Sequence, residues 1–323
     1  MTIRGIKTLR RAACVVRSRF VRGSIILLYH RIADTRDDPF SLNVPPARFA
    51  EHLQAVRRIG RPIPLNGLVD GLERGSVPSR GIVVTFDDGY ADNLREARPL
   101  LEQYDVPATV FVTSGLLGGV NECWWDALSR MLLTARTPSA PLRLTIAGKT
   151  HVLRAERGHT RLRTVHRLLR AMDDERRAEA LRQIGAWAEV ELVRVAVHRC
   201  LSAAELKELA ASPVIDVGAH TSTHPALSDL PAARARRELV DSKDELERIL
   251  GRPVTSCAYP YGLASDYSDE TLSLTREAGY RCACTAIPDV VWRRTDPFQL
   301  PRLWVGDWSA DTFTRQLSVW LHG

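Results

Sequence analysis

Two short segments hold side chains whose types and spacing suit hydrolysis at a metal ion. Val83–Tyr90 reads VVTFDDGY, an apolar run that ends in two carboxylates and a glycine. His220–His224 reads HTSTH and follows a second apolar run, Val214–Ala219. At that spacing one helical turn would place both imidazoles on the same face. Two histidines and one carboxylate are a common catalytic zinc set with a position left for water. The second carboxylate is then free to act as a base, which indicates metal-assisted hydrolysis.

The elements that must position these residues alternate along the chain, because each short apolar run is followed by a stretch with helical periodicity. We expect strands at Ile25–Tyr29, Gly81–Phe86, Ala108–Thr113, Val214–Ala219, Thr255–Tyr259, Tyr280–Thr285 and Leu300–Val305. Helices are expected at Pro46–Ile59, Asn93–Gln103, Pro231–Leu250, Asp269–Gly279 and Asp311–Leu321. This alternation implies parallel strands with crossover helices. The predicted fold class is therefore α/β, a deformed (β/α)7-type barrel of about seven strands. No glycine-rich fingerprint follows a strand, which argues against a dinucleotide fold.

The stretch from about residue 118 to about 200 breaks this rhythm. It contains a predicted helix, Trp124–Thr134, and a predicted hairpin, Leu142–Ile146 with Thr150–Arg154. Arg-rich helical segments then continue to about Val195. We interpret it as a mostly helical insertion on the exit loop of the third strand. It either shapes access to the active face of the barrel or forms a buttress on its side.

Composition limits the class and the compartment of the protein. The 323 residues are 45% hydrophobic, enough for one large domain. No apolar run approaches the roughly 20 residues that span a bilayer. The longest near the N-terminus, Ile25–Tyr29, is also shorter than the apolar core of a signal peptide, about 7–15 residues. The six cysteines form no Cys-x-x-Cys pair. We therefore predict a cytoplasmic protein with reduced thiols.

The net charge of +7 is concentrated at the N-terminus, where the first 22 residues contain seven basic residues and no acid. We treat residues 1–23 as a basic arm and residues 24–323 as the barrel. With its interleaved apolar residues the arm suits an amphipathic helix on anionic lipid, which would make the protein membrane-associated. The alternative is a solvated arm or a helix packed on the barrel. The rest of the chain lacks a basic, aromatic-rich patch, so we expect no nucleic-acid partner.

The motifs resemble those of one known family. TFDDGY at Thr85–Tyr90 together with HTSTH is similar to the polysaccharide deacetylase family, also called carbohydrate esterase family 4 or the NodB-homology group. AYPYG at Ala258–Gly262 resembles the proline-tyrosine motif of that family. The resemblance runs from about Ser24 to the C-terminus, except over the insertion. It implies a metal-dependent deacetylase that removes acetyl groups, N-acetyl rather than O-acetyl, from a polysaccharide or glycan precursor. The implied partner is thus an acetylated glycan.

The resemblance also implies roles for single residues. Asp87 matches the general base, and the ligands of a divalent metal match Asp88, His220 and His224. Zinc suits this ligand set best, although cobalt, nickel or iron fit similar ligands. The backbone N–H of Tyr261 matches the donor to the oxyanion, a contact that contributes several kcal/mol to transition-state stabilisation in enzymes of this kind.

The chain departs from the common family pattern at two positions. The arginine that usually stands two residues before the proline is replaced by Ala258, and we predict that Arg302 supplies its charge. The late Leu-x-His motif, source of the catalytic acid, is not recognisable either. His30, at the end of the first predicted strand, is the better candidate, and the chain resembles a circularly permuted subset of the family. An imidazole suits protonation of the leaving group because it titrates near neutrality.

Substrate contacts are assigned to Trp308, Tyr259 and Arg302. Trp308 partly resembles the tryptophan of the family's late motif, which helps to form the pocket for the acetyl methyl group. Trp124 and Trp125 suit either sugar stacking or, more simply, packing of a helix core. Three other functions remain open: hydrolysis of another amide on the same barrel, a catalytically silent sugar-binding module, and phosphotransfer with magnesium. The two histidines argue against the last, because magnesium prefers oxygen ligands.

Overall fold

The protein is described here from a computed structural model. It describes residues 23–35, 38–118, 122–133, 140–146, 148–153, 158–170, 172, 174–190 and 198–322. The basic arm predicted for residues 1–23 lies outside this part of the chain apart from Gly23, so its proposed contact with lipid stays a prediction.

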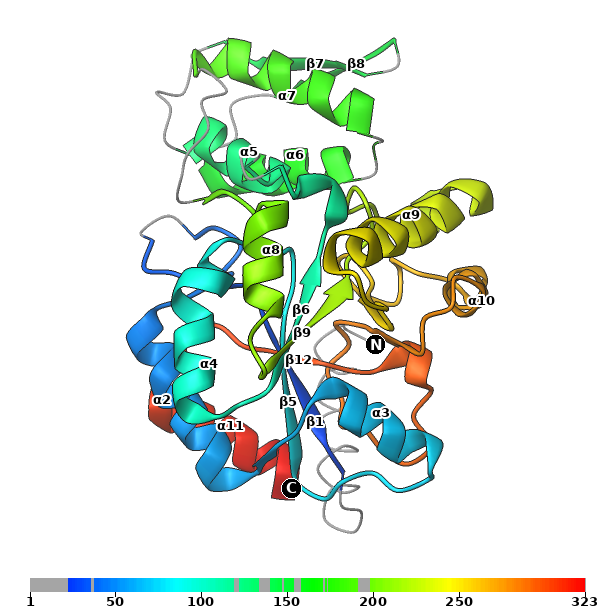
Figure 1. The fold of residues 1–323 in the computed structure, drawn as a ribbon. Coiled ribbons are helices and arrows are strands. Elements are labelled where there is room, and N and C mark those ends of the chain that lie inside the picture. Colours follow the sequence, from blue (N-terminus) through cyan, green and yellow to red (C-terminus); the bar gives the residue numbers. More distant parts are fainter. Residues whose placement is uncertain are drawn as a thin grey trace, which may run out of the picture.

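A curled, parallel sheet forms the centre of the molecule (Figure 1). Its strand order is β11-β10-β9-β6-β5-β1-β12, and the short β4 pairs with the start of β5. The bounds are β1 Ile25–Tyr29, β4 Arg61–Pro62, β5 Gly81–Phe86, β6 Ala108–Val112, β9 Ile215–Ala219, β10 Ser256–Ala258, β11 Cys282–Cys284 and β12 Leu303–Trp304. An isolated bridge joins Cys284 at the end of β11 to Leu300, which precedes β12. The predicted deformed (β/α) barrel is thereby confirmed, as a half-barrel of mostly parallel strands.

The central strands are buried on both faces, which is typical of a parallel sheet. Every residue of β1, β5 and β6 is buried, as expected where helices cover a parallel sheet. The register pairs Ile25 with Ile82 and Tyr29 with Phe86. The residues that follow β1 and β5 therefore leave the sheet side by side, at the same edge. That edge carries the candidate site.

Helices cover the sheet from outside (Figure 1). Between the strands run α2 Pro46–Ile59, α3 Leu65–Glu73, a π-helical turn Asn93–Ala97 that leads into α4 Arg98–Tyr104, α8 Ala203–Ala210, α9 Ala232–Leu250 and α10 Asp269–Glu277. After the last strand comes α11 Ala310–His322. Their buried faces, such as Phe49, Leu53 and Val56 of α2, join the main apolar core with the strands. None of the helices in the described part of the chain combines the length and apolar composition needed to cross a membrane.

The segment predicted as an insertion forms a second apolar cluster. Its elements are α5 Trp124–Leu133, the antiparallel pair β7 Leu142–Ile146 and β8 Lys149–Leu153, α6 Gly158–Arg170 and α7 Asp174–Ala188. Leu128, Val165 and Ile184 are fully buried within it. In Figure 1 these green elements lie together at the end of the barrel towards which β6 and β9 point. They therefore stand over the edge of the sheet that carries the site. The domain bounds themselves stay a prediction.

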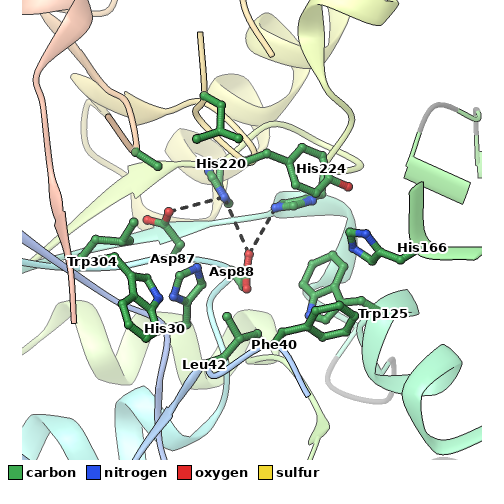
Figure 2. A pocket seen from close by; sticks show the side chains of 14 residues that line it. His30, Phe40, Leu42, Asp87, Asp88, Trp125, His166, His220, His224 and Trp304 are labelled. Carbon is green, nitrogen blue, oxygen red and sulfur yellow. Dashed lines mark ion pairs between the residues drawn. The ribbon is translucent and has the colours of Figure 1, made fainter. Parts of the chain in front are cut away.

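Two short strands, β2 Arg31–Ile32 and β3 Asn43–Val44, pair with each other just beyond β1. They carry the chain from His30 past Phe40 and Leu42, which lie beside the site (Figure 2).

Candidate active site

Asp87 and Asp88 leave the end of β5 in different directions. The amide of Asp87 still donates to the carbonyl oxygen of Tyr29 at 3.0 Å, so this residue continues the sheet. Asp88 then adopts φ +75° and Gly89 φ +77°, both in the left-handed region. A side chain at position 89 would also press on Val112, because a Cβ there would stand 3.1 Å from that side chain. The glycine thus allows the turn that separates the two carboxylates.

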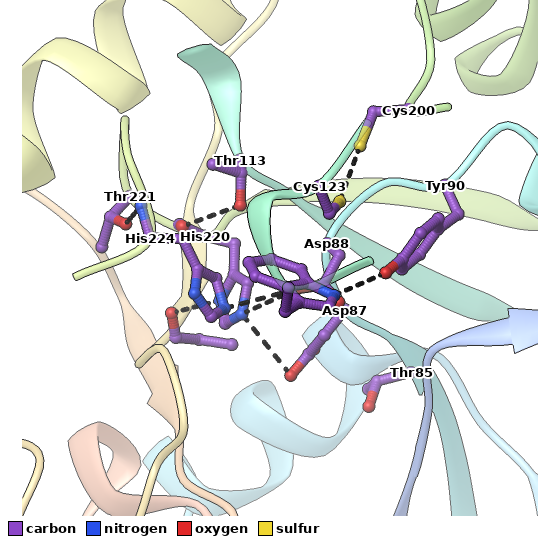
Figure 3. A network of polar contacts seen from close by, with 12 residues as sticks. Thr85, Asp87, Asp88, Tyr90, Thr113, Cys123, Cys200, His220, Thr221 and His224 are labelled. Carbon is purple, nitrogen blue, oxygen red and sulfur yellow. Dashed lines mark hydrogen bonds and ion pairs between the residues drawn. The ribbon is translucent and has the colours of Figure 1, made fainter. Parts of the chain in front are cut away.

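The two histidines lie in a loop after β9, and the predicted helical turn at HTSTH is wrong. Thr221 and His224 have φ +62° and +59°, which no right-handed helix contains. The Thr221 hydroxyl accepts the amide of His224 at 3.1 Å, and the Thr113 hydroxyl donates to the carbonyl oxygen of His220 at 3.3 Å (Figure 3). A tight turn, stabilised by the Thr221 and Thr113 hydroxyls, therefore places the His220 and His224 rings next to each other.

Asp88, His220 and His224 form a compact set of metal-ligating atoms. One ligand atom from each lies within 4.8 Å of the others, and all three residues are buried. Asp88 Oδ1 is 3.3 Å from His224 Nε2 and 3.7 Å from His220 Nε2. Ligands about 2.1 Å from a tetrahedral ion stand roughly 3.4 Å apart, so the set fits such an ion. His220 Nδ1 is 2.8 Å from the carbonyl oxygen of Ala258, a contact that turns Nε2 towards Asp88.

Burial sets the charge of these groups in the protein without metal. It lowers the pKa of His220, and lowers the pKa of His224 to about 3. Burial also raises the pKa of the Asp88 carboxyl. Both imidazoles are therefore neutral at neutral pH, which is the form that binds a metal ion.

Arg302 forms a buried ion pair with Asp87. Its Nη1 and Nη2 donate to the two carboxylate oxygens at 2.6 and 2.7 Å, and its Nε donates to the carbonyl oxygen of Thr285 at 2.7 Å. Burial alone would raise the pKa of Asp87, but the charge and hydrogen bonds of Arg302, together with the nearby His220 and His30, lower this pKa to about 2. Asp87 is thus ionised and fixed in orientation, with a charge supplied by the residue just before β12 where Ala258 offers none.

His30, labelled in Figure 2, and Tyr261 line the same cavity. His30 follows β1 directly, and its Nδ1 is buried without a hydrogen-bond partner. Burial lowers the pKa of this imidazole. Tyr261 adopts φ +61° after β10, and none of the described residues accepts a hydrogen bond from its amide. One catalytic candidate therefore has a ring nitrogen without a partner, and the other has a free backbone N–H.

Left-handed backbone is concentrated at this site. Four of the eight non-glycine residues with positive φ in the described part of the chain belong to it: Asp88, Thr221, His224 and Tyr261. Such conformations are costly for these residue types and persist where surrounding contacts enforce them, often at active sites.

A comparison with known proteins decides the family. The model of polysaccharide deacetylases matches residues 74–134 and 162–283, more than half of the chain. The chain belongs to the polysaccharide deacetylase family. It is therefore a hydrolase of the carbohydrate deacetylase class, whose substrates are acetylated glycans and whose members generally use a divalent metal.

Individual relatives are distant. YxkH of Bacillus subtilis (strain 168), a polysaccharide deacetylase homologue, is 22% identical over 280 residues, which are 86% of this chain and 70% of that protein. The solved deacetylase PplD of Streptococcus pyogenes is 20% identical with a TM-score of 0.60, over 91% of this chain and 98% of that one. IcaB from Ammonifex degensii is 19% identical with a TM-score of 0.61, over 94% and 98%. These two structures show a shared fold.

The family match does not include His30 or Arg302, which lie outside the matched residues. In the structure β1 lies between β5 and β12, so His30 reaches the same edge of the sheet as Asp87. The circular permutation inferred from the position of His30 stays a prediction.

Three predicted substrate contacts are absent from the cavity beside the metal set. Tyr259 is buried, stacks on Tyr267 with ring centroids 4.9 Å apart, and donates its hydroxyl to the carbonyl oxygen of Phe298. Arg302 is buried beneath Asp87 and acts on that carboxylate. Trp308 lines a separate cavity of about 420 Å³ against α11. None of the three therefore lines this cavity in the structure, and their roles as substrate contacts stay predictions.

The cavity that does adjoin the metal set has a volume of about 360 Å³. Sequence reasoning missed five of its walls: Phe40, Leu42, His166, Leu263 and Trp304. Trp125, which the sequence offered for either sugar stacking or helix packing, also lines it. Trp125 and His166 come from the green segment above the barrel (Figure 2). The Trp125 indole N–H donates to the Tyr90 hydroxyl at 2.7 Å, and the ring lies 4.6 Å from that of His224. Tyr90 (Figure 3) is the last residue of the TFDDGY motif, so a hydrogen bond to this motif fixes the position of Trp125.

Glu238 is a further residue that the sequence did not reveal. From α9 its carboxylate accepts hydrogen bonds from the amides of Ser222 and Thr223 at 3.0 and 2.9 Å, and from the Thr223 hydroxyl at 2.7 Å. On the insertion side, Arg177 donates to the carbonyl oxygen of Thr223 at 3.2 Å. The loop between the two histidines is thus held from both sides.

Proposed function

We propose that the protein is a metal-dependent deacetylase that hydrolyses acetyl groups, N-acetyl in preference to O-acetyl, from a polysaccharide or glycan precursor. The observation that carries this proposal is the convergence of Asp88, His220 and His224 within 4.8 Å. Asp87, ionised and oriented by Arg302, stands beside that set, with Oδ2 3.8 Å from His220 Nε2.

Zinc is the ion that we propose for this site. Two neutral imidazoles and one carboxylate are a donor set that zinc takes readily, and buried hydrogen bonds already orient His220. When bound, a divalent cation polarises an acyl carbonyl group and lowers the pKa of water.

The side chains around that position account for the proton transfers. Asp87 accepts a proton from the attacking water at a carboxylate oxygen that Arg302 holds in place. The Tyr261 N–H donates to the carbonyl oxygen as negative charge develops there. His30, in its protonated form, then protonates the leaving nitrogen as the C–N bond breaks, and acetate and the free amine are released. Proton exchange with solvent then returns Asp87 to its ionised form and His30 to its protonated form.

One combined measurement tests this proposal. The pure protein is analysed for metal, and acetate release from N-acetylglucosamine oligomers is followed with and without a chelator. We expect about one zinc per chain and chelator-sensitive release. A chain without bound metal that still binds the oligomers would instead be a silent sugar-binding module. Activity on cyclic amides but not on acetylated sugars would indicate another amide hydrolase.

We further propose a cytoplasmic location. Cys123, Cys200, Cys257, Cys282 and Cys284 are free, buried thiols, as expected of a reducing compartment. Fractionation of cells that express a tagged chain tests this, and recovery outside the cytoplasm would contradict it.

A further inference from the structure

The cavity has two sides of different chemistry. His30, Asp87, Asp88 and the two ligand histidines form the side that we assign to the reaction. Across from them, Trp125 and His166 of the insertion form a second side (Figure 2). Tyr261 also lines the cavity, next to His166. Among the lining residues, His166 and Tyr261 alone carry polar side chains that the proposed mechanism does not use.

The Tyr261 hydroxyl has no partner within the described part of the chain, although it is buried. Burial raises the pKa of this phenol, so it keeps its proton and is a donor at neutral pH. A buried polar group left without a hydrogen bond costs about 1–3 kcal/mol. Such groups are rare in native proteins and indicate a missing partner.

His166 presents a neutral imidazole to the same space. Its ring stacks on that of Trp124 with centroids 4.9 Å apart and lies 4.9 Å from the ring of Phe40. Burial lowers its pKa to about 4, so one ring nitrogen donates and the other accepts. No described residue is hydrogen-bonded to either nitrogen. Aromatic packing thus fixes the ring while its polar atoms stay available.

These two groups are close but do not contact each other through a hydrogen bond. Their ring centroids are 6.2 Å apart at an interplanar angle of 85°. The Tyr261 ring is held in turn by the Arg170 guanidinium, 4.3 Å above it, and by the His224 ring at 4.9 Å. Both groups are therefore preorganised, which lowers the entropy lost when a ligand binds between them.

We propose that the His166 imidazole and the Tyr261 hydroxyl bind hydroxyl groups of the sugar that carries the acetyl group, so that the insertion sets selectivity for glycans. This inference rests on the proposed deacetylase function. A sugar ring offers apolar C–H faces and hydroxyl edges. The cavity matches it with apolar walls, including Phe40, Trp125 and Trp304, and with two neutral groups that both donate hydrogen bonds.

Tyr261→Phe and His166→Phe remove the polar atoms and keep the aromatic packing. Each variant is assayed with the N-acetylglucosamine trimer and with 4-nitrophenyl acetate, which has no sugar. The ratio of kcat/KM for the trimer to kcat/KM for the ester should fall about 10-fold or more, because one hydrogen bond to a substrate hydroxyl is lost. His166→Gln, which keeps a donor and an acceptor, should recover part of the ratio. Tyr267→Phe and His159→Phe, at sites outside the cavity, are the matched controls.

A binding measurement gives a second readout. Calorimetry with the trimer and protein stripped of metal by chelation should show at least a 5-fold weaker affinity in both Phe variants. If the unaltered protein releases no acetate and does not bind the trimer, the proposed function itself fails. If it releases acetate while neither the ratio nor the affinity moves in Tyr261→Phe, the subsite is wrong and the function stands.

Discussion

Arg302 and Asp87 form a buried, two-pronged ion pair, with N–O distances of 2.6 and 2.7 Å. The two residues are 215 positions apart in the chain and meet because β12 and β5 flank β1. A planar guanidinium matches both oxygens of a carboxylate, which a lysine ammonium does not. The pair therefore fixes the direction of the carboxylate as well as its charge.

Replacing Arg302 should impair both activity and stability. Arg302→Ala leaves Asp87 buried without its partner, which costs about 3–5 kcal/mol of unfolding free energy in comparable pairs. We expect acetate release to fall by at least about 100-fold, because a misplaced base loses proton transfer. The activity and stability of Arg302→Lys should lie between those of the unaltered protein and those of Arg302→Ala. Arg281→Ala, which removes a half-exposed ion pair, is the control. Full activity in Arg302→Lys would show that the fork geometry is unnecessary.

His30→Ala tests the acid. Loss of general acid catalysis typically reduces turnover by about 10²–10⁴-fold. The loss should be large for an N-acetyl substrate, whose amine leaves poorly without a proton, and small for 4-nitrophenyl acetate, whose phenolate leaves readily. Metal content should not change, because His30 is outside the ligand set. Equal losses on both substrates would indicate that His30 has a structural role only.

Removing a metal ligand should abolish stoichiometric binding. Asp88→Ala, His220→Ala and His224→Ala each delete one of three protein ligands. We expect metal content well below one per chain and acetate release close to background. Chelation of the unaltered protein should lower its melting temperature, since a ligand that binds the native state stabilises it. His159→Ala, which is exposed on α6, should retain metal and serves as the control. A ligand variant that binds zinc normally would contradict the assignment.

Glu238 should affect metal affinity without touching the metal. Glu238→Ala removes three hydrogen bonds from the loop between the histidines. Supporting residues of this kind typically contribute about 10–100-fold in affinity. Glu238→Gln keeps one acceptor oxygen and should lose less. Zinc affinity measured by competition with a chelating dye separates this role from simple destabilisation. Glu245→Gln, on the exposed face of the same helix, should leave affinity unchanged.

The strands were predictable because their signal is local. β1 and β5 are continuous buried apolar runs, and their predicted bounds agree with the structure. α3 was not predicted, since Gly67 and Gly71 lower its helix propensity. Gly71 has a tertiary reason, because a Cβ there would stand 2.6 Å from the carbonyl oxygen of Ser76.

The turn at HTSTH was not predictable from its own residues. Its left-handed positions depend on Glu238 and Arg177, which come from other elements, and spacing alone carries no trace of them. The role of Arg302 could be predicted, because Ala258 stands where the family usually has an arginine and another residue had to supply that charge. The sequence raised the insertion and Trp125 as possible parts of the substrate site, but it gave no sign of His166, which reaches the cavity only through tertiary packing.

Trp304, rather than Trp308, should contact the substrate. Side chains alternate along a strand, so Leu303 of β12 faces the core while Trp304 lines the cavity with 37% of its surface exposed. Trp304→Ala should raise KM for the N-acetylglucosamine trimer about 10-fold, as expected when an aromatic contact is lost. Trp308 packs against the main core and its carbonyl oxygen is 2.7 Å from His52 Nε2. Trp308→Ala should therefore lower stability and leave KM unchanged. A larger rise in KM for Trp308→Ala than for Trp304→Ala would restore the assignment made from the sequence motif.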